Sequence, residues 1–163
     1  MDKALTFSGS KSELSYTKIK IYLNKLNEDN NPNWGDMNSS QMLYHCNSYI
    51  EVSFGIKKIH FVNRILFRVF FRYFFLQYLK YIEFDINKFK KNSRTLKVFK
   101  SSHLLIDFNN EKERLIENLT KVQNIDTKII YHQLYGNISS NLFKKLITFH
   151  TSYHFNQFGI LTD

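Results

Sequence analysis

The chain contains few of the residues that break helices, with one proline and five glycines among 163 residues. A sheet of many short strands would need more turns than these residues provide, so helices are favoured. The single cysteine, Cys46, excludes a disulfide within the chain. Neither a repeat nor a low-complexity linker divides the sequence. We therefore expect one helical domain over residues 1–163, with residues 1–14 as a flexible N-terminal extension.

The first residues also lack a recognisable secretion signal. The sequence Met1-Asp-Lys-Ala-Leu-Thr contains no apolar segment of the kind that a signal peptide needs. Together with the lone cysteine, this predicts a cytoplasmic protein. The 43% of hydrophobic residues suffices for one core, because a chain of this length buries about two-thirds of its unfolded surface.

Acidic residues are outnumbered by basic ones, and the formal net charge is +9. A basic surface can bind nucleic acid by releasing counterions from the phosphates. The lysines are, however, scattered along the chain instead of forming a stripe. The densest cluster lies in a stretch that we interpret as a solvated loop: Lys88, Lys90, Lys91, Arg94, Lys97 and Lys100. We therefore expect no nucleic-acid partner.

A pair of histidines, His150 and His154, stands out in a phenylalanine-rich stretch. Residues four apart lie on the same face of a helix, so the two imidazoles share the apolar face of Phe143, Leu146 and Ile147. Buried imidazoles need partners for their nitrogen atoms. Either a divalent metal satisfies them, or they are core histidines bonded to backbone or water. A metal would need a further ligand from elsewhere in the chain.

His45 is the candidate for that further ligand. Asn38 suits the N-cap of a helix and Gln41 the third helical position, which together form a capping box. This helix start places His45 in the second turn, on the face that points to the interior. His45, His150 and His154 thus form a candidate metal site on two helices.

The motifs around these histidines resemble those of a known family. The sequences Trp34-Gly-Asp-Met-x-x-x-Gln-Met-Leu-x-His45 and His150-x-x-x-His154-x-x-Gln157-Phe-Gly159 are similar to motifs of the DinB-like metal-binding superfamily. Within it, they resemble a branch of small bacterial proteins of unknown function. The resemblance runs from about residue 16 to the end of the chain. Tyr153 departs from the branch, where another histidine is usual, but that position is not a ligand in the superfamily.

The resemblance implies a fold as well as a metal site. The fold is an all-α four-helix bundle with a long crossover that contains an extra aromatic-rich helix. The sequence pattern places helices near residues 15–26, 39–55, 59–81, 110–122 and 140–158. The stretch that holds His132 and Gly136 is expected to be a loop, with His132 in contact with solvent.

The chemistry that the resemblance implies is metal-dependent. His45, His150 and His154 would bind Zn, Ni or Fe and leave a coordination position open. Because the superfamily includes thiol-dependent transferases and hydrolase-like proteins, we expect a metal-dependent thiol transferase or hydrolase acting on a small molecule. A non-catalytic metal-binding or ligand-binding protein and an oligomeric interaction protein are the alternatives. Histidine ligands must be deprotonated, so metal binding is expected to weaken at pH 5.5.

The aromatic segment over residues 59–82 is long enough to cross a bilayer, but Arg64, Arg68 and Arg72 interrupt it. Each arginine near a helix centre costs about 2.5 to 3.5 kcal/mol on insertion, which excludes a membrane span. The arginines, with His60, form a stripe that we expect to face solvent or acidic partners. The rings outnumber what a small core can cover, which predicts a homodimer through this helix. A membrane surface is the less favoured partner.

Overall fold

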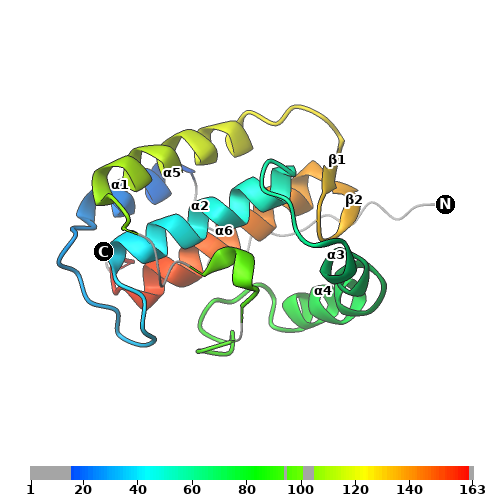
Figure 1. Cartoon of the computed structure of the whole chain (residues 1–163), viewed down its shortest axis with the longest axis horizontal. Coiled ribbons are helices and arrows are strands. Elements are labelled where there is room, and N and C mark those ends of the chain that lie inside the picture. The colour runs from blue at the N-terminus through cyan, green and yellow to red at the C-terminus, as the bar shows by residue number, and fades with distance from the viewer. Residues whose placement is uncertain (1–15, 94, 101–104, 162–163) are drawn as a thin grey trace.

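In the computed structural model, the described residues are 16–93, 95–100 and 105–161, so the expected extension over residues 1–14 lies outside them. The described chain is mostly helical, with one two-stranded antiparallel sheet (Figure 1). Its elements, in order, are α1 (Tyr16–Lys25), α2 (Ser39–Phe54), α3 (Phe61–Leu66), the π-helical segment η1 (Phe67–Phe71), α4 (Arg72–Tyr81), the short 3-10 helix η2 (Lys97–Phe99), α5 (Phe108–Gln123), β1 (Ile129–His132), β2 (Gly136–Ser139) and α6 (Ser140–Gln157).

The helix starts follow the capping residues in the sequence. The Asn38 side chain accepts from the Gln41 backbone N–H at 2.9 Å, and the Asn38 N–H donates to Gln41 Oε1 at 3.0 Å. This capping box begins α2, and Gly55 ends it with a left-handed φ of 79°. Asp107 and Ser139 are simple N-caps of α5 and α6, where their side chains accept from the backbone N–H groups of Asn110 and Leu142. The helices predicted from the sequence at these places are confirmed.

Helix α2 is at the centre of the helical layer. It packs against α5 and α6, and α1 packs against the same two helices (Figure 1). The apolar side chains between them are fully buried, among them Leu43, Ile50, Leu115, Phe143, Leu146 and Ile147. Burial of this area is the main driving force for the fold.

The prediction of an all-α fold is wrong in one element. The stretch around His132 and Gly136, expected to be a loop, is a β-hairpin in which Ile129 pairs with Ser139 and His132 with Gly136. β-branched residues in β1 favour an extended backbone, and Gly136 has the positive φ of 68° that the turn requires. Four residues per strand are too few for the alternation of polar and apolar residues to stand out in the sequence.

The aromatic segment forms a continuous crossover through α3, η1 and α4, which we call the aromatic crossover. It is anchored to the hairpin turn by Gln133, whose side-chain oxygen accepts from the Ile59 N–H at 2.7 Å. Arg68 Nε donates to the Gln133 carbonyl at 3.3 Å, and Arg72 Nη2 donates to the Asn137 carbonyl at 3.4 Å. The expectation that the arginine stripe faces solvent is therefore wrong for Arg68 and Arg72, whose half-buried side chains bond the hairpin carbonyls, whereas His60, which extends the stripe, is exposed as expected. Within the described ranges, no helix combines the length and hydrophobicity needed to cross a membrane.

A buried polar network connects α2 to α5. Asn47 Nδ2 donates to Glu111 Oε2 at 2.7 Å and to the Glu111 carbonyl at 2.9 Å. Asn118 Nδ2 donates to Asn47 Oδ1 at 2.9 Å, and Arg114 forms an ion pair with Glu111 at 2.9 Å. Since buried polar groups lose their water, each bond in this network must be present for the two helices to pack.

Replacing Asn47 with alanine tests this network. The change removes the donor to Glu111 Oε2 and to the Glu111 carbonyl and leaves the Asn118 amide without its acceptor, so we expect Asn47→Ala to lower the free energy of unfolding by about 3 kcal/mol. Urea denaturation measures the loss. Asn109→Ala, at an exposed position of α5, is the matched control and should change it by less than about 0.5 kcal/mol. Equal losses in the two variants would show that the network does not stabilise the fold.

Candidate metal centre

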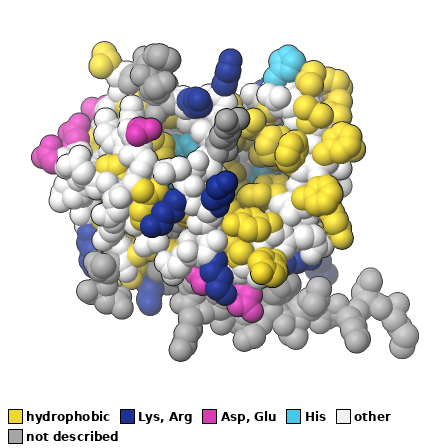
Figure 2. Space-filling view, turned by 90° about the horizontal axis from the view of Figure 1, so that it is seen from below, with side chains coloured by type: hydrophobic (Ala, Val, Ile, Leu, Met, Phe, Trp, Pro, Cys, Tyr) yellow, Lys and Arg dark blue, Asp and Glu magenta, His cyan; other side chains and the backbone are white. Residues whose placement is uncertain are grey.

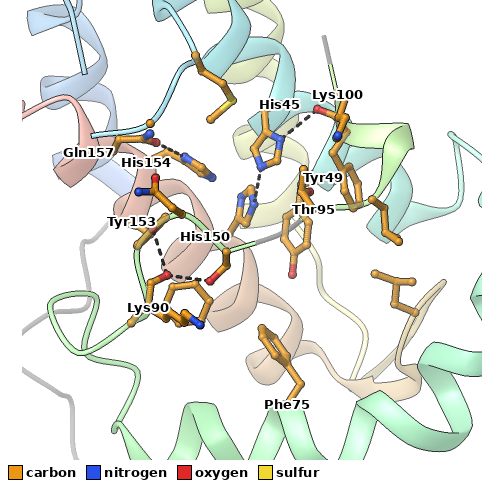
Figure 3. Close-up of a pocket in the computed structure, with 18 of the residues that line it drawn as sticks. His45, Tyr49, Phe75, Lys90, Thr95, Lys100, His150, Tyr153, His154 and Gln157 are labelled. Atoms are coloured by element: carbon orange, nitrogen blue, oxygen red, sulfur yellow. Dashed lines mark hydrogen bonds between the residues drawn. The ribbon is translucent and has the colours of Figure 1, made fainter. Parts of the chain in front are cut away.

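The three histidines predicted as ligands meet between α2 and α6. One ring nitrogen from each of His45, His150 and His154 lies within 4.8 Å of the others. Figure 3 shows the three rings turned toward one another. The closest pair is His45 Nε2 and His150 Nε2, which are 3.1 Å apart. Nitrogen ligands of a tetrahedral zinc ion would be about 3.4 Å apart, so small side-chain movements would complete a site.

His45 is oriented by a backbone carbonyl. Its Nδ1 lies 3.1 Å from the carbonyl oxygen of Phe99, at the end of η2. A carbonyl only accepts, so Nδ1 must carry the proton. A neutral His45 ring then has its lone pair on Nε2, the nitrogen that faces His150 and can accept either a hydrogen bond from His150 Nε2–H or a metal ion. This is how ligating histidines are held in metal sites, with the second nitrogen donating to an oxygen.

His154 is oriented in the same way by a side chain. Its Nδ1 lies 2.8 Å from Gln157 Oε1, and Gln157 Nε2 donates to the Trp34 carbonyl at 2.6 Å. Because the Trp34 carbonyl requires the amide nitrogen, the Gln157 oxygen must face His154 and accept from its Nδ1–H. The lone pair of His154 is thereby placed on Nε2. Gly35 makes room for this amide, because a Cβ at its position would lie 2.7 Å from Gln157 Nε2.

His150 is held by ring stacking. The Tyr49 ring lies on its face, with centroids 3.9 Å apart and planes inclined by 15°. Its Nδ1 has no hydrogen-bond partner among the described residues. The ring is partly exposed toward the cavity next to it, whereas His45 and His154 are buried.

Burial keeps all three rings neutral. The surrounding protein lowers the pKa of His45, and it lowers the pKa of His150 well below its usual range, with the neighbouring histidines adding to the effect. The pKa of His154 falls to about 3, chiefly through burial and secondarily through the proximity of His45. Neutral imidazoles are the form that binds metal, so the site is ready for a cation at neutral pH.

A cavity of about 980 Å³ opens onto the three histidines. Its walls are largely aromatic and come from several elements, including the aromatic crossover: Trp34, Tyr49, Phe67, Phe71, Phe75, Tyr78, Phe89, Phe99, Tyr135 and Tyr153. Lys90 and Lys100 supply positive charge, and Asp36 is the carboxylate among its lining residues. The cavity can therefore hold a small molecule of substantial apolar area with an anionic group.

Three residues around the cavity were not predicted to belong to the site. The Tyr49 and Tyr135 hydroxyls are hydrogen-bonded to each other, and burial raises the pKa of both phenols. His132 packs on Tyr135, with ring centroids 4.6 Å apart. The expectation that His132 is in contact with solvent is wrong, because the hairpin turns it inward and it is fully buried. No motif or spacing in the sequence marks the two tyrosines as residues of the site.

Cys46 and His60 are not part of the cluster of three histidines. Cys46 is buried beside Met42, with the two sulfur atoms 3.8 Å apart, and burial raises the pKa of its thiol. It acts as a small core side chain. His60 is exposed at the start of α3, and His103 lies outside the described residues.

A family model matches residues 9–159, which is most of the chain, and its description is "Protein of unknown function (DUF1569)". The chain belongs to the DUF1569 family. The matched range includes all three histidines of the DUF1569 protein and the residues that orient them. No curated protein and no solved structure matches the chain.

The buried His132 generates a prediction about pH. Burial lowers its pKa from 6.5 to about 3, so between these values the unfolded chain binds a proton that the native protein does not. Stability must therefore fall as the pH drops from 7 to 5, with His132 accounting for roughly 2 kcal/mol of the loss. In His132→Asn, the amide can still accept from the Leu134 N–H, as His132 Nδ1 does at 3.1 Å. We expect this variant to lose roughly 2 kcal/mol less than wild type over that range.

Urea denaturation at pH 7 and pH 5 measures the difference. His60→Asn is the matched control, because it removes an exposed histidine. A pH dependence that is the same in wild type and His132→Asn would mean that His132 is protonated equally in the folded and unfolded states.

Proposed function

We propose that this DUF1569 protein binds a divalent metal ion through His45, His150 and His154. The observation that carries the proposal is the convergence of three neutral imidazoles, whose ring nitrogens lie within 4.8 Å of one another at a cavity. Two of them have the Nδ1–H bonded to an oxygen, which directs Nε2 to the common centre. Zinc, nickel and iron all accept such nitrogen ligands.

The proposal extends to the superfamily that the motifs resemble. Helices α1, α2, α5 and α6 would be the four helices of a DinB-like bundle, and the aromatic crossover would be the insertion between the second and third. The two motif histidines of α6 and the histidine of α2 would be the ligands of the metal site that those helices share. The hairpin before α6 is an addition to that plan.

We propose a metal-dependent transferase or hydrolase, with a small molecule, such as a thiol, as substrate. A bound metal ion with three protein ligands supplies a Lewis acid with an open position, which can activate water or a thiolate. The cavity supports an enzyme over a closed metal site, because about 980 Å³ of space reaches the histidines. Lys90 and Lys100 would attract an anionic group of the substrate, and the aromatic walls would exclude water from its apolar part.

The alternative is a non-catalytic metal-binding or ligand-binding protein. A hydrolase generally needs a side chain that accepts a proton from water. The cavity lining offers few such groups, because Asp36 is its single carboxylate, and this scarcity favours the non-catalytic alternative. The Tyr49 hydroxyl lies beside His150, but burial raises its pKa and so makes it a donor instead of a base. Turnover of model thiol and ester substrates by the metal-loaded protein distinguishes the two functions.

Metal analysis and thermal unfolding test the site itself. We expect the protein purified without chelator to contain one divalent ion, and added zinc to stabilise the protein emptied by chelator by about 3 kcal/mol at a hundredfold excess over Kd. His154→Ala should abolish the stabilisation, while the matched control His60→Ala should keep it. An equal shift in both variants would place the metal elsewhere.

The pH dependence of this binding differs from what the sequence suggested. Burial holds the pKa of His154 at about 3 and lowers the pKa values of His45 and His150, so the ligands lose less of their binding form on acidification than free histidines would. We now expect zinc affinity to change little between pH 7.5 and pH 5.5 and to fall only as the pH approaches the lowered pKa values. Calorimetric titration at the two pH values measures the change. A large loss of affinity at pH 5.5 would indicate ligands with ordinary pKa values.

Gln157 has an orienting role that can be tested separately. Gln157→Leu removes the oxygen that accepts from His154 Nδ1–H, so the ring can rotate and present either nitrogen. We expect zinc affinity to fall by about 10-fold to 100-fold, as for other residues that orient a ligand. Gln77→Leu, at an exposed position of α4, should leave it unchanged. Unchanged affinity in Gln157→Leu would show that packing alone orients His154.

A further inference from the structure

One face of the aromatic crossover leaves an extended apolar surface uncovered. Its large side chains are between 41% and 85% exposed: Phe61, Val62, Ile65, Leu66, Val69, Phe70, Tyr73, Phe74 and Tyr81. Figure 2 shows hydrophobic side chains gathered on one side of the molecule. Monomeric soluble proteins rarely expose apolar patches larger than a few hundred Å², so a surface of this kind indicates a binding partner. We call it the aromatic face.

The charged residues within the segment that forms the aromatic face all have one sign. Residues 56–82 contain no aspartate or glutamate. The basic side chains of this segment are Lys57, Lys58, Arg64, Arg68, Arg72 and Lys80. A partner that covers the aromatic face must therefore accommodate positive charge at its edge.

A cationic cleft lies on the same segment. Arg68, Arg72 and Lys80 line a cleft of about 420 Å³, together with Tyr73 and Gln77. Arg68 Nη2 is buried and has no hydrogen-bond partner among the described residues. The Arg68 guanidinium lies over the Tyr131 ring, 4.8 Å from its centroid, so its charge is fixed at the wall of the cleft, where it and Lys80 attract a phosphate group. The cleft therefore matches the phosphate group of a lipid.

We propose that the aromatic face docks on the surface of an anionic lipid bilayer. The exposed rings enter the boundary between headgroups and acyl chains, and the cationic cleft binds lipid phosphate. Apolar insertion combined with attraction to anionic headgroups is the usual basis of interfacial binding by amphipathic helices. This function is separate from the metal site, although the opposite side of the crossover forms the cavity wall through Phe67 and Phe75.

A second copy of the chain fits the aromatic face less well. In a two-fold contact the same patch meets itself, so the basic edge of one copy would lie against the basic edge of the other. Like charges brought together in this way oppose association. The homodimer predicted from the sequence accounts for the apolar area but not for the charge, whereas an anionic bilayer accounts for both.

Vesicle sedimentation of the full chain tests the proposal. We expect the protein to sediment with vesicles of equal parts phosphatidylcholine and phosphatidylglycerol, to remain in solution with phosphatidylcholine alone, and to be released by high salt. In the double variant Phe70→Ser and Phe74→Ser, binding should fall by about a hundredfold, since burial of each ring contributes roughly a factor of ten. Ile21→Ser with Ile129→Ser removes two exposed apolar side chains from other elements and should bind as wild type does.

The cationic edge is tested by Lys80→Gln against Lys121→Gln, an exposed lysine of α5. Only the first should weaken binding to the anionic vesicles. Equal sedimentation with neutral and anionic vesicles would overturn the proposal, as would no sedimentation with either. A stable dimer in detergent-free buffer that is disrupted by the two serine substitutions and does not bind vesicles would assign the aromatic face to a second copy instead.

Discussion

The packing of α2 against α6 is the contact on which the candidate centre depends. His45 comes from the first helix and His150 with His154 from the second, so no pair of neighbouring residues alone forms the site. The contact brings imidazoles together in a buried space, where their nitrogens must find partners. The Phe99 carbonyl and the Gln157 side chain provide two of these, and the remaining lone pairs share one direction. The fold thus buries three imidazoles around one position. A cation bound at that position would offset the free energy lost when the imidazoles leave water.

The hairpin has a structural role that extends beyond its two strands. Gln133 lies in the turn between β1 and β2. Its side chain accepts from the Ile59 N–H and donates to the Lys57 carbonyl at 2.8 Å. It thereby fixes the start of the aromatic crossover, whose inner side forms a cavity wall and whose outer side is the aromatic face. Tyr135, from the same turn, stacks on Phe75 with the ring planes inclined by 8°. A short polar turn therefore positions both the cavity and the exposed surface.

The sequence predicted the ligand histidines because helical periodicity is a local property. Capping residues set where α2 and α6 begin, and the spacing of four put His150 and His154 on one face. The orienting groups were harder to predict. Gln157 is three residues from His154 and could have been inferred from helix geometry, but its amide direction depends on the Trp34 carbonyl, more than 100 residues away in sequence. The Phe99 carbonyl carries no side-chain signal at all.

By itself, the sequence determined the helices, their caps, the histidine pair and the inward direction of His45, because each follows from interactions between residues a few positions apart. Only the tertiary structure decided the rest. The burial of His132, the inward turn of Arg68 and Arg72, and the cavity beside the histidines arise where the hairpin and the aromatic crossover meet the helices. Such contacts join segments that are distant in sequence. The path of the backbone decides which carbonyl an arginine or an imidazole can reach, and every residue type has a carbonyl, so the sequence does not indicate the partner.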